Sequence, residues 1–389
     1  MKSKKLMSFL MVMALFVGTL TCTLPVSAIS IDEIKEESTY IAENGDIIFV
    51  PVDDAAKNRR ELNKLLGSDD KKTLIFPAGS TTKLDTFLNV GDNTTIIATD
   101  ATIIQTKDGR GILHHVVDKD NFKACKNVTI SGGVWKNAVN KKLNSMFRFC
   151  HATNIKLKNM NIELNYQGHG IELIACKQCE VIGCKVVAEN KSTKKSDSVE
   201  EAIQIDIATP KTAPGIYKNG NGKMLKGQTC QDITVKNCII SGSRGLCCNA
   251  ATTEPKFKNN IHKNIVIQGN TITGCISEGL TLLNTAGVTV KNNIITSKSK
   301  RNNFYADGIH MTLLGKTEKA KKYKNVFEKN TVYGKYYGID IASSSGSMHG
   351  PVTLKNNKVY SSKGKGYAIH LYKPVIKKLI QKNNKSAKW

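Results

Sequence analysis

The sequence predicts an all-β solenoid in which short parallel strands stack coil upon coil. Three observations predict it. A β-branched, asparagine-rich strand motif returns along most of the chain, a second apolar strand lies between its copies, and neighbouring copies are separated by a few tens of residues. Spacing of this kind is typical of repeat proteins. One coil cannot bury an apolar face alone, so neighbouring coils must stack to build a core.

The first motif is a β-branched, a polar, an apolar and another polar residue, followed by Asn or Gly and a further apolar pair. Its clear copies span residues 128–133, 155–159, 233–237, 265–270, 288–293 and 352–357. The intervals between the second turn residues are 23, 37, 27 and 27 residues, counted over Asn270, Asn293, Asn330, Asn357 and Asn384. Asparagine tolerates a left-handed backbone, and stacked asparagine side chains can hydrogen-bond to one another. We therefore expect asparagines to stack at this corner of the coil.

The second strand begins with Gly or Ala. An aliphatic residue, then a polar or small residue, then another aliphatic residue follow. Its copies span residues 170–173, 202–205, 245–248, 279–282, 308–311, 338–341 and 368–371. Alternation with a period of two directs the aliphatic side chains inward and the intervening side chains outward. Each coil is therefore expected to contain at least two strands joined by short polar corners.

Both ends of the repeats carry different patterns. Residues Asp53 to Leu66 favour a short helix with Leu62, Leu65 and Leu66 on one face, and a strand and turn follow over residues 74–79. Because a solenoid must cover its open end, we expect this helix to be an N-terminal cap. The lysine-rich residues 373–388 fit either a last coil or a basic tail.

The N-terminus predicts a secretory signal. A lysine-rich start precedes an apolar run over residues 6–20, and the Val-Ser-Ala at 26–28 suits signal peptidase. The run is shorter than a membrane-spanning helix needs, so we expect no membrane insertion. We expect a secreted, extracellular protein cleaved after about Ala28. The chain divides into a signal peptide (1–28), the cap and first coils (29–100) and the repeats (101–389).

The cap, the Phe-Pro-Ala-Gly turn at 76–79, the Ile-Ser-Gly-Gly-Val-Trp stretch at 130–135 and the asparagine-rich coils resemble the pectate-lyase-like right-handed parallel β-helix superfamily. The resemblance covers roughly residues 40 to 385. It implies a single-stranded right-handed parallel β-helix with a short N-terminal capping helix, and a bias toward carbohydrate. The superfamily includes polysaccharide lyases, polygalacturonase-type hydrolases, uronan epimerases, phage tailspikes and non-catalytic surface proteins, so the fold does not select a reaction.

Catalytic signatures of these subfamilies match this sequence poorly. Gly168-His169-Gly170 resembles the Gly-His-Gly of polygalacturonases, but the Asp-Asp pair that those enzymes carry one coil earlier is missing here. Tyr305, Asp307 and His310 resemble the Tyr, Asp and His of alginate epimerases, although the spacing departs from theirs. The paired aspartates that hold calcium in pectate lyases are not evident. The resemblance therefore carries over no catalytic residue, and calcium stays open but unsupported.

Charge and cysteine content bear on the partners. The formal net charge is +25, which suits an acidic polysaccharide or an anionic cell-wall polymer. A plain lysine coat on a solvated solenoid is the alternative. We expect no nucleic-acid partner, since an aromatic-basic motif is missing, and a monomer. Cys176, Cys179 and Cys184 have a faintly metal-like spacing, but Cys179 and Cys184 occupy repeat positions that hold Ile, Val, Cys or Asn elsewhere. We therefore expect stacked, buried cysteines rather than a metal site.

The outward residues of the second strand form a column that makes one face a candidate site. Adjacent rungs lie about 4.8 Å apart. The column contains Glu172, Gln204, Cys247, Thr281, His310, Asp340 and His370, the strands start at His169, Glu201, Arg244, Glu278 and Asp307, and an offset column holds Asp206, Asn249, Thr312 and Tyr372. Long loops over residues 188–200 and 207–231 flank this face, and long loops on rigid scaffolds are common binding sites. From this face we select His169, Glu201, Gln204 and His370 as substrate-binding candidates.

Glu172 and Asp206 form the first catalytic hypothesis. They lie one rung and two residues apart, which is roughly 8 Å by strand geometry. That separation falls within the range for inverting glycoside hydrolysis. One carboxyl would act as general acid and the other as base.

β-Elimination from a uronic acid is the second hypothesis. Arg244 would neutralise the substrate carboxylate, and His310 would act as base with Asp307 or Asp340 orienting it. The expected function is that of a secreted carbohydrate-active β-helix protein that cleaves an acidic polysaccharide as a lyase or a glycoside hydrolase. The alternative is a non-catalytic protein that binds a polyanionic glycan at the cell surface.

Overall fold

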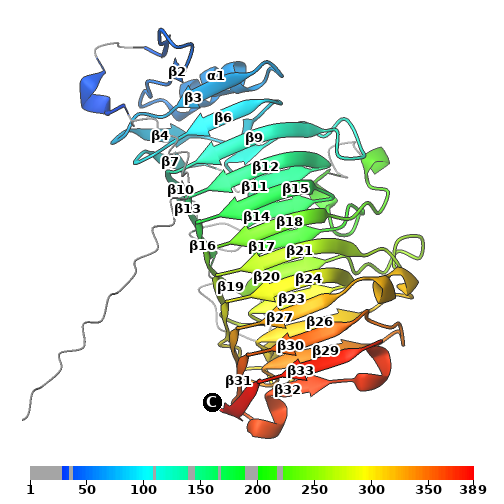
Figure 1. Cartoon of the computed structure of the whole chain (residues 1–389). Helices are drawn as coiled ribbons and strands as arrows, with labels where there is room; N and C mark the ends of the chain where they lie inside the picture. Colours follow the sequence, from blue (N-terminus) through cyan, green and yellow to red (C-terminus); the bar gives the residue numbers. More distant parts are fainter. Residues whose placement is uncertain are drawn as a thin grey trace, which may run out of the picture.

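Three long parallel sheets run the length of the molecule and enclose its core (Figure 1). The computed structural model describes residues 29–34, 38–107, 111–138, 145–164, 168–188, 200–216 and 222–389. The expected signal peptide lies outside these residues. No helix within the described ranges is long and apolar enough to cross a membrane.

Each sheet takes one strand from almost every coil. The first sheet contains β1 (Tyr40–Ile41), β2 (Ile47–Ile48), β3 (Lys72–Ile75), β6 (Thr94–Ile97), β9 (Cys125–Ser131), β12 (Ala152–Lys158), β15 (Lys177–Ile182), β18 (Gln231–Lys236), β21 (His262–Gln268), β24 (Thr285–Lys291), β27 (Asn325–Glu328), β30 (Val352–Lys355) and β33 (Leu379–Lys382). The second contains β4 (Thr81–Leu84), β7 (Thr102–Gln105), β10 (Val134–Asn137), β13 (Asn161–Leu164), β16 (Lys185–Ala188), β19 (Ile239–Gly242), β22 (Thr271–Gly274), β25 (Ile294–Ser297), β28 (Thr331–Gly334), β31 (Lys358–Ser361) and β34 (Lys385–Lys388). The third contains β5 (Leu88–Asn89), β8 (Leu113–His114), β11 (Ser145–Cys150), β14 (His169–Ile174), β17 (Glu201–Asp206), β20 (Arg244–Asn249), β23 (Leu280–Leu283), β26 (Ile309–Leu313), β29 (Ile339–Ser343) and β32 (Ile369–Leu371).

This arrangement confirms the predicted right-handed parallel β-helix and refines it. A typical coil has three strands, in agreement with the expected minimum of two, because the apolar pair after the asparagine turn forms a strand of its own in the second sheet. The lysine-rich C-terminal residues form the last coil, since β33 pairs with β30 and β34 pairs with β31. Only β1 and β2 pair antiparallel among the described strands.

The predicted capping helix is α1 (Ala55–Leu66), which lies against β4 and β5 at the N-terminal end (Figure 1). The Asp54 side chain accepts hydrogen bonds from the backbone amides of Ala56 and Lys57 and so caps its first turn. Leu62 and Leu66 are buried in the solenoid core. The remaining short helical segments are α2 (Pro214–Ile216), η1 (Ile31–Glu33), η3 (Gly222–Met224), η4 (Phe304–Ala306), η5 (Glu318–Lys322), η6 (Lys365–Tyr367) and η7 (Lys373–Val375).

Aromatic rings fill the core next to the cap. Trp135 is fully buried and meets Phe76 and Phe147 edge-on, with ring centroids 6.0 and 5.2 Å apart. Its indole N–H donates to the Gly132 carbonyl at 2.9 Å, so the only polar atom of the side chain is satisfied. The stretch at 130–135 thus fixes the corner between β9 and β10.

The predicted stacking of asparagines is present at the corner between the first and second sheets. The first turn residue has a left-handed backbone, with φ of 56° at both Asn292 and Asn356. The next residue points inward, and its amide Nδ2 donates to the Oδ1 of the equivalent asparagine in the following coil. These bonds link Asn270, Asn293, Asn330, Asn357 and Asn384 at 2.9–3.0 Å. We call these five residues the asparagine ladder.

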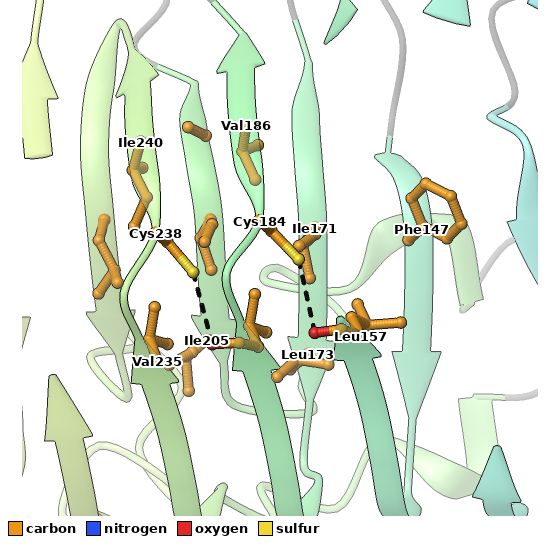
Figure 2. Close-up of a cluster of buried hydrophobic side chains, with 14 of the residues drawn as sticks. Phe147, Leu157, Ile171, Leu173, Cys184, Val186, Ile205, Val235, Cys238 and Ile240 are labelled. Atoms are coloured by element: carbon orange, nitrogen blue, oxygen red, sulfur yellow. Dashed lines mark hydrogen bonds between the residues drawn. The ribbon is translucent and has the colours of Figure 1, made fainter. Parts of the chain in front are cut away.

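Cysteines continue this inward column toward the N-terminus. Cys184 and Cys238 occupy the ladder position in earlier coils, and Figure 2 shows the Cys184 thiol directed at the Leu157 carbonyl, 3.4 Å away. The Cys238 backbone N–H donates to Asn270 Oδ1 at 2.9 Å, which joins the two parts of the column. Every described cysteine except Cys275 is buried. Cys176, Cys179 and Cys184 belong to the core, which confirms the expectation that they act as small apolar residues.

Candidate functional site

The outer face of the third sheet carries the predicted column in the predicted register. Glu172 pairs with Gln204, and the pairing continues coil by coil to His370. The sequence analysis missed Arg148, which pairs with Glu172 from β11 and extends the column toward the N-terminus. The alternation of Phe147, Arg148 and Phe149 was the signal that could have revealed it.

The offset column differs from the expected set. Leu283 and Ala342 lie in it between the predicted polar residues, which makes this part of the face more apolar. Near β14 and β17 an apolar cluster covers the column from outside the solenoid. It consists of Val117, Cys150, Ile174, Ala175, Ala208, Ala213, Ile216 and Leu225. The segment after β17 folds over the face here, although residues 189–199 and 217–221 of the predicted long loops lie outside the described residues.

This cover determines the surroundings of the first catalytic pair. Asp206 is 3% exposed, and its Oδ1 accepts a hydrogen bond from the Ile207 backbone N–H at 3.0 Å. Burial, followed by the charge of Glu172, raises the pKa of Asp206 well above its usual value. Glu172 is 7% exposed and accepts a hydrogen bond from the Ser145 hydroxyl. Gln204 is also buried, and its Oε1 has no hydrogen-bond partner among the described residues.

A charged cluster surrounds Arg244 at the start of β20. Its Nη1 lies 2.6 Å from Glu201 Oε1, and its Nε lies 2.9 Å from Glu278 Oε2. Burial lowers the pKa of Arg244, but the charges of Glu278 and Glu201 outweigh burial and raise it above its usual value. The guanidinium therefore stays charged and is already held by two carboxylates. The lyase hypothesis requires Arg244 to neutralise a substrate carboxylate, and the guanidinium has little capacity left to do so.

His169, at the start of β14, extends this charged cluster through its contacts with Glu200 and Glu201. Its Nε2 lies 3.4 Å from Glu200 Oε2, and its Nδ1 lies 3.5 Å from Glu201 Oε2. Burial lowers the pKa of His169, but the charges of Glu172, Glu201 and Glu200 together raise it above its ordinary value. Sequence reasoning selected Glu201 and missed Glu200, because that residue precedes the repeat motif.

The second cluster is centred on His310 in β26. Its Nδ1 lies 2.9 Å from Asp340 Oδ2 and 3.3 Å from Asp307 Oδ2. Asp340 Oδ1 in turn lies 2.6 Å from His370 Nδ1. The Tyr337 backbone N–H donates to Asp307 Oδ1 at 2.9 Å and fixes that carboxyl. Three consecutive coils therefore bring together all four predicted residues of this group.

The charge on His310 follows from its two carboxylate neighbours. Burial lowers the pKa of His310, but hydrogen bonds with Asp307 and Asp340 outweigh burial and raise it to about 9. Burial also raises the pKa of Asp307 to about 7, although its hydrogen bond with His310 opposes this shift. At neutral pH the imidazole is thus a cation that can donate a proton rather than a base.

We expect the imidazolium signal of His310 to persist in an NMR titration until the pH approaches about 9. Because its folded-state pKa is raised, the stabilisation from this proton is complete below about pH 6.5 and is lost as the pH rises through about 9. His262 serves as the internal control, since burial lowers its pKa to about 4. A His310 midpoint near 6.5 would contradict the ion-pair arrangement.

A groove of about 730 Å³ joins the two clusters across β20, β23, β26 and β29. Arg244 and Glu278 lie at one end, and His310 and Asp340 lie at the other. Thr281 is on the floor between them, and its hydroxyl has no hydrogen-bond partner among the described residues. The groove therefore offers polar groups to a ligand along several coils.

Aromatic rings form the wall of this groove, and of these the sequence analysis had singled out only Tyr305. Phe304, Tyr305, Tyr336 and Tyr337 line it from the turns that lead into β26 and β29. Phe304 stacks on His310 with centroids 5.0 Å apart, and Tyr337 stacks on His370 at 4.4 Å. These rings sit in turns that lack the repeat pattern, and their proximity to His310 depends on how each turn folds back.

Among the residues that the structure describes, two groups of side chains have the donor atoms of a cation site. His169, Glu200 and Glu201 form one, and Asp307, His310 and Asp340 form the other. In both groups the carboxylates already have cationic partners, namely Arg244 for Glu201 and His310 for the two aspartates. The fold can therefore hold these clusters together without a metal ion.

Four further histidines have structural surroundings. His115, His151, His262 and His349 are buried and contact backbone groups. The pKa of each is lowered, with burial as the largest cause. They stabilise corners in the neutral form and lie outside the groove.

Known proteins resemble this chain mainly in fold. Residues 213–384 match the family described as "Right handed beta helix region". No curated protein matches the chain significantly. The surface adhesin PfbA of Streptococcus pneumoniae is 14% identical, with a TM-score of 0.50 over 86% of this chain and 91% of the adhesin. The tailspike protein of E. coli bacteriophage HK620 is 14% identical, with a TM-score of 0.52 over 82% of this chain and 56% of the tailspike. Identities this low establish a shared fold and nothing about activity.

Proposed function

Because the chain is a right-handed parallel β-helix protein, we propose that it acts outside the cell on a polysaccharide and hydrolyses a glycosidic bond in the groove. One observation carries this proposal. A histidine with two carboxylate neighbours lies in a groove of about 730 Å³ whose wall is aromatic. Aromatic rings stack on sugar faces, and paired ionisable groups perform the acid–base chemistry of glycoside cleavage.

In this proposal His310 donates the proton to the departing sugar oxygen. Asp340 lies only 2.9 Å from His310, too close to hold a water on the opposite face of the sugar, so it stabilises the imidazolium. Glu278, the other carboxylate in the groove lining, accepts the proton of the attacking water. Asp307 does not line the groove, so we assign it the role of positioning His310. Arg244 would contact sugar hydroxyls at the end of the groove next to Glu278. Glu172 and Asp206 remain the competing acid–base pair.

Hydrolysis is preferred over β-elimination because of the charges in the groove. Elimination from a uronic acid requires a cation that faces the substrate carboxylate. Arg244 lines the groove, and Glu201 and Glu278 already neutralise it. The sugar at the cleavage point is therefore expected to be uncharged, even if the polymer is acidic elsewhere.

A glycan panel tests the reaction with the mature chain, residues 29–389. Pectins, alginate, hyaluronan, chondroitin and teichoic-acid-bearing walls would be incubated with and without calcium. New reducing ends without the ultraviolet absorbance of an unsaturated product are the expected result. Reducing ends with that absorbance would establish a lyase. Retention on a polymer without any new ends would identify a binding protein and refute the hydrolase.

A further inference from the structure

A second cavity of about 510 Å³ lies at the corner where third-sheet strands lead into the first sheet. Its walls come from segments near residues 122, 227–231, 259–263 and 316–323, which lead into β9, β18, β21 and β27 of the first sheet. These loops project from the right-hand edge of the solenoid in Figure 1. We call this cavity the corner pocket, and neither catalytic hypothesis uses it.

Hydrogen bonds between the loops hold the walls of the corner pocket. The Asn121 backbone N–H donates to Gln228 Oε1 at 3.0 Å, and Asn260 Nδ2 donates to the Gly227 carbonyl at 2.7 Å. The Lys316 backbone N–H donates to Asn259 Oδ1 at 2.9 Å. The pocket is thus formed before any ligand arrives, which reduces the entropy that binding costs.

Positive charge is concentrated in this pocket. Lys263, Lys316 and Lys319 line it, and no carboxylate lies within ion-pair distance of them in the part of the chain that the structure describes. The one acidic lining residue, Glu318, pairs with Lys321 at 3.0 Å. An anionic group would therefore meet up to three cations without a competing partner.

Rigid strands and aromatic rings supply the rest of the pocket. Gln231 and Lys263 are paired residues of β18 and β21, so they lie about one rung, or about 4.8 Å, apart. Phe122 and Tyr323 also line the cavity and offer apolar rings beside the lysines. A sugar ring with a charged substituent matches this combination, and the volume lies within the range of small-ligand pockets.

We propose that the corner pocket binds an acidic sugar unit, meaning a pyranose that bears a carboxylate or a phosphate. The pocket adjoins the groove, because Leu314 lines the groove and Lys316, two residues later, lines the pocket. One polymer can therefore present an uncharged unit to His310 and an acidic unit to the lysines. This binding does not depend on the reaction proposed for the groove.

Isothermal titration calorimetry on the mature chain tests the pocket directly. The probes are trigalacturonate, a trimer of phosphate-bearing sugar units, and neutral maltotriose. At least one acidic probe should bind, and its affinity should fall as salt is added. Maltotriose should bind more weakly or not at all. The stronger acidic probe identifies the charged substituent. Failure of both acidic probes, or equal affinity for maltotriose, would overturn the proposal.

Paired lysine variants assign the binding to this pocket. In the double variant Lys263→Gln and Lys316→Gln we expect affinity for the acidic probe to fall at least tenfold, since each charge-assisted hydrogen bond contributes about tenfold or more. The matched control is Lys358→Gln with Lys385→Gln, which removes two charges from adjacent strands of the second sheet. Asp340→Asn should leave this affinity unchanged. If the two double variants lost equal affinity for the acidic probe, net charge alone would explain the binding, and the proposed site would be refuted.

Discussion

Replacing Asp340 by Asn is expected to lower turnover on the cleaved polysaccharide by about two to four orders of magnitude. Asp340 is the residue that links the cluster, because its two oxygens contact His310 at 2.9 Å and His370 at 2.6 Å. An amide removes the negative charge that stabilises the imidazolium, while the shape of the side chain is preserved. Initial rates on the substrate found in the glycan panel provide the measurement.

The same substitution should change the titration of His310. With one of two carboxylate neighbours neutralised, the pKa of His310 should fall from about 9 toward its usual value, and NMR can follow this change. Glu163→Gln, on the outer face of the second sheet, is the matched control and should alter neither property. If turnover survives in Asp340→Asn but is lost in Glu172→Gln and Asp206→Asn, the competing pair is the catalytic one.

Repeat register made the floor of the site predictable. Once the second strand was aligned in each coil, the column from Glu172 to His370 followed from strand pairing, and every pairing in it is observed. The asparagine ladder was predictable for the same reason. Both rest on a period that the sequence repeats many times, so an error in aligning one coil does not shift the alignment of the others.

The walls of the site were not predictable by this route. Phe304 and Tyr337 lie in turns without a repeated pattern, and their contacts with His310 and His370 depend on how each turn folds back. The two-carboxylate clamp on Arg244 is an intermediate case. The repeat aligned Glu201, Arg244 and Glu278 as successive strand starts, but only the structure shows that Glu278 Oε2 lies 2.9 Å from the arginine.

Net charge was a poor guide to the groove for a related reason. The chain carries +25, yet acidic side chains dominate the described third-sheet face. Those residues are Glu172, Glu200, Glu201, Asp206, Glu278, Asp307 and Asp340, all of them buried. Lysines instead lie on the other two sheets and at the corners, as at the corner pocket. Under the proposed function, the total charge therefore bears on where an anionic polymer would bind, and the local charge bears on which sugar unit would be cleaved.

Replacing Asn330 by Ala is expected to lower the free energy of unfolding by about 3–5 kcal/mol. Asn330 is 1% exposed in the middle of the asparagine ladder. Its Oδ1 accepts from the backbone N–H and the Nδ2 of Asn293, both at 3.0 Å, and its Nδ2 donates to the Val290 carbonyl at 2.8 Å. Alanine would remove these three bonds and leave the buried Asn293 backbone N–H without its partner, and each buried group that loses its partner costs about 1–3 kcal/mol. Urea unfolding of both proteins measures the difference.

The end of the ladder supplies a control that separates burial from hydrogen bonding. Asn384 accepts the same pair of bonds from Asn357, at 3.0 and 2.9 Å, but it lies in the last coil and is half-buried. Water can replace the missing partner there, so Asn384→Ala should cost only about 1 kcal/mol. Equal costs at the two positions would mean that the bonds themselves, rather than their exclusion from water, stabilise the coil. A smaller cost at Asn330 than at Asn384 would contradict the ladder's role in holding successive coils together.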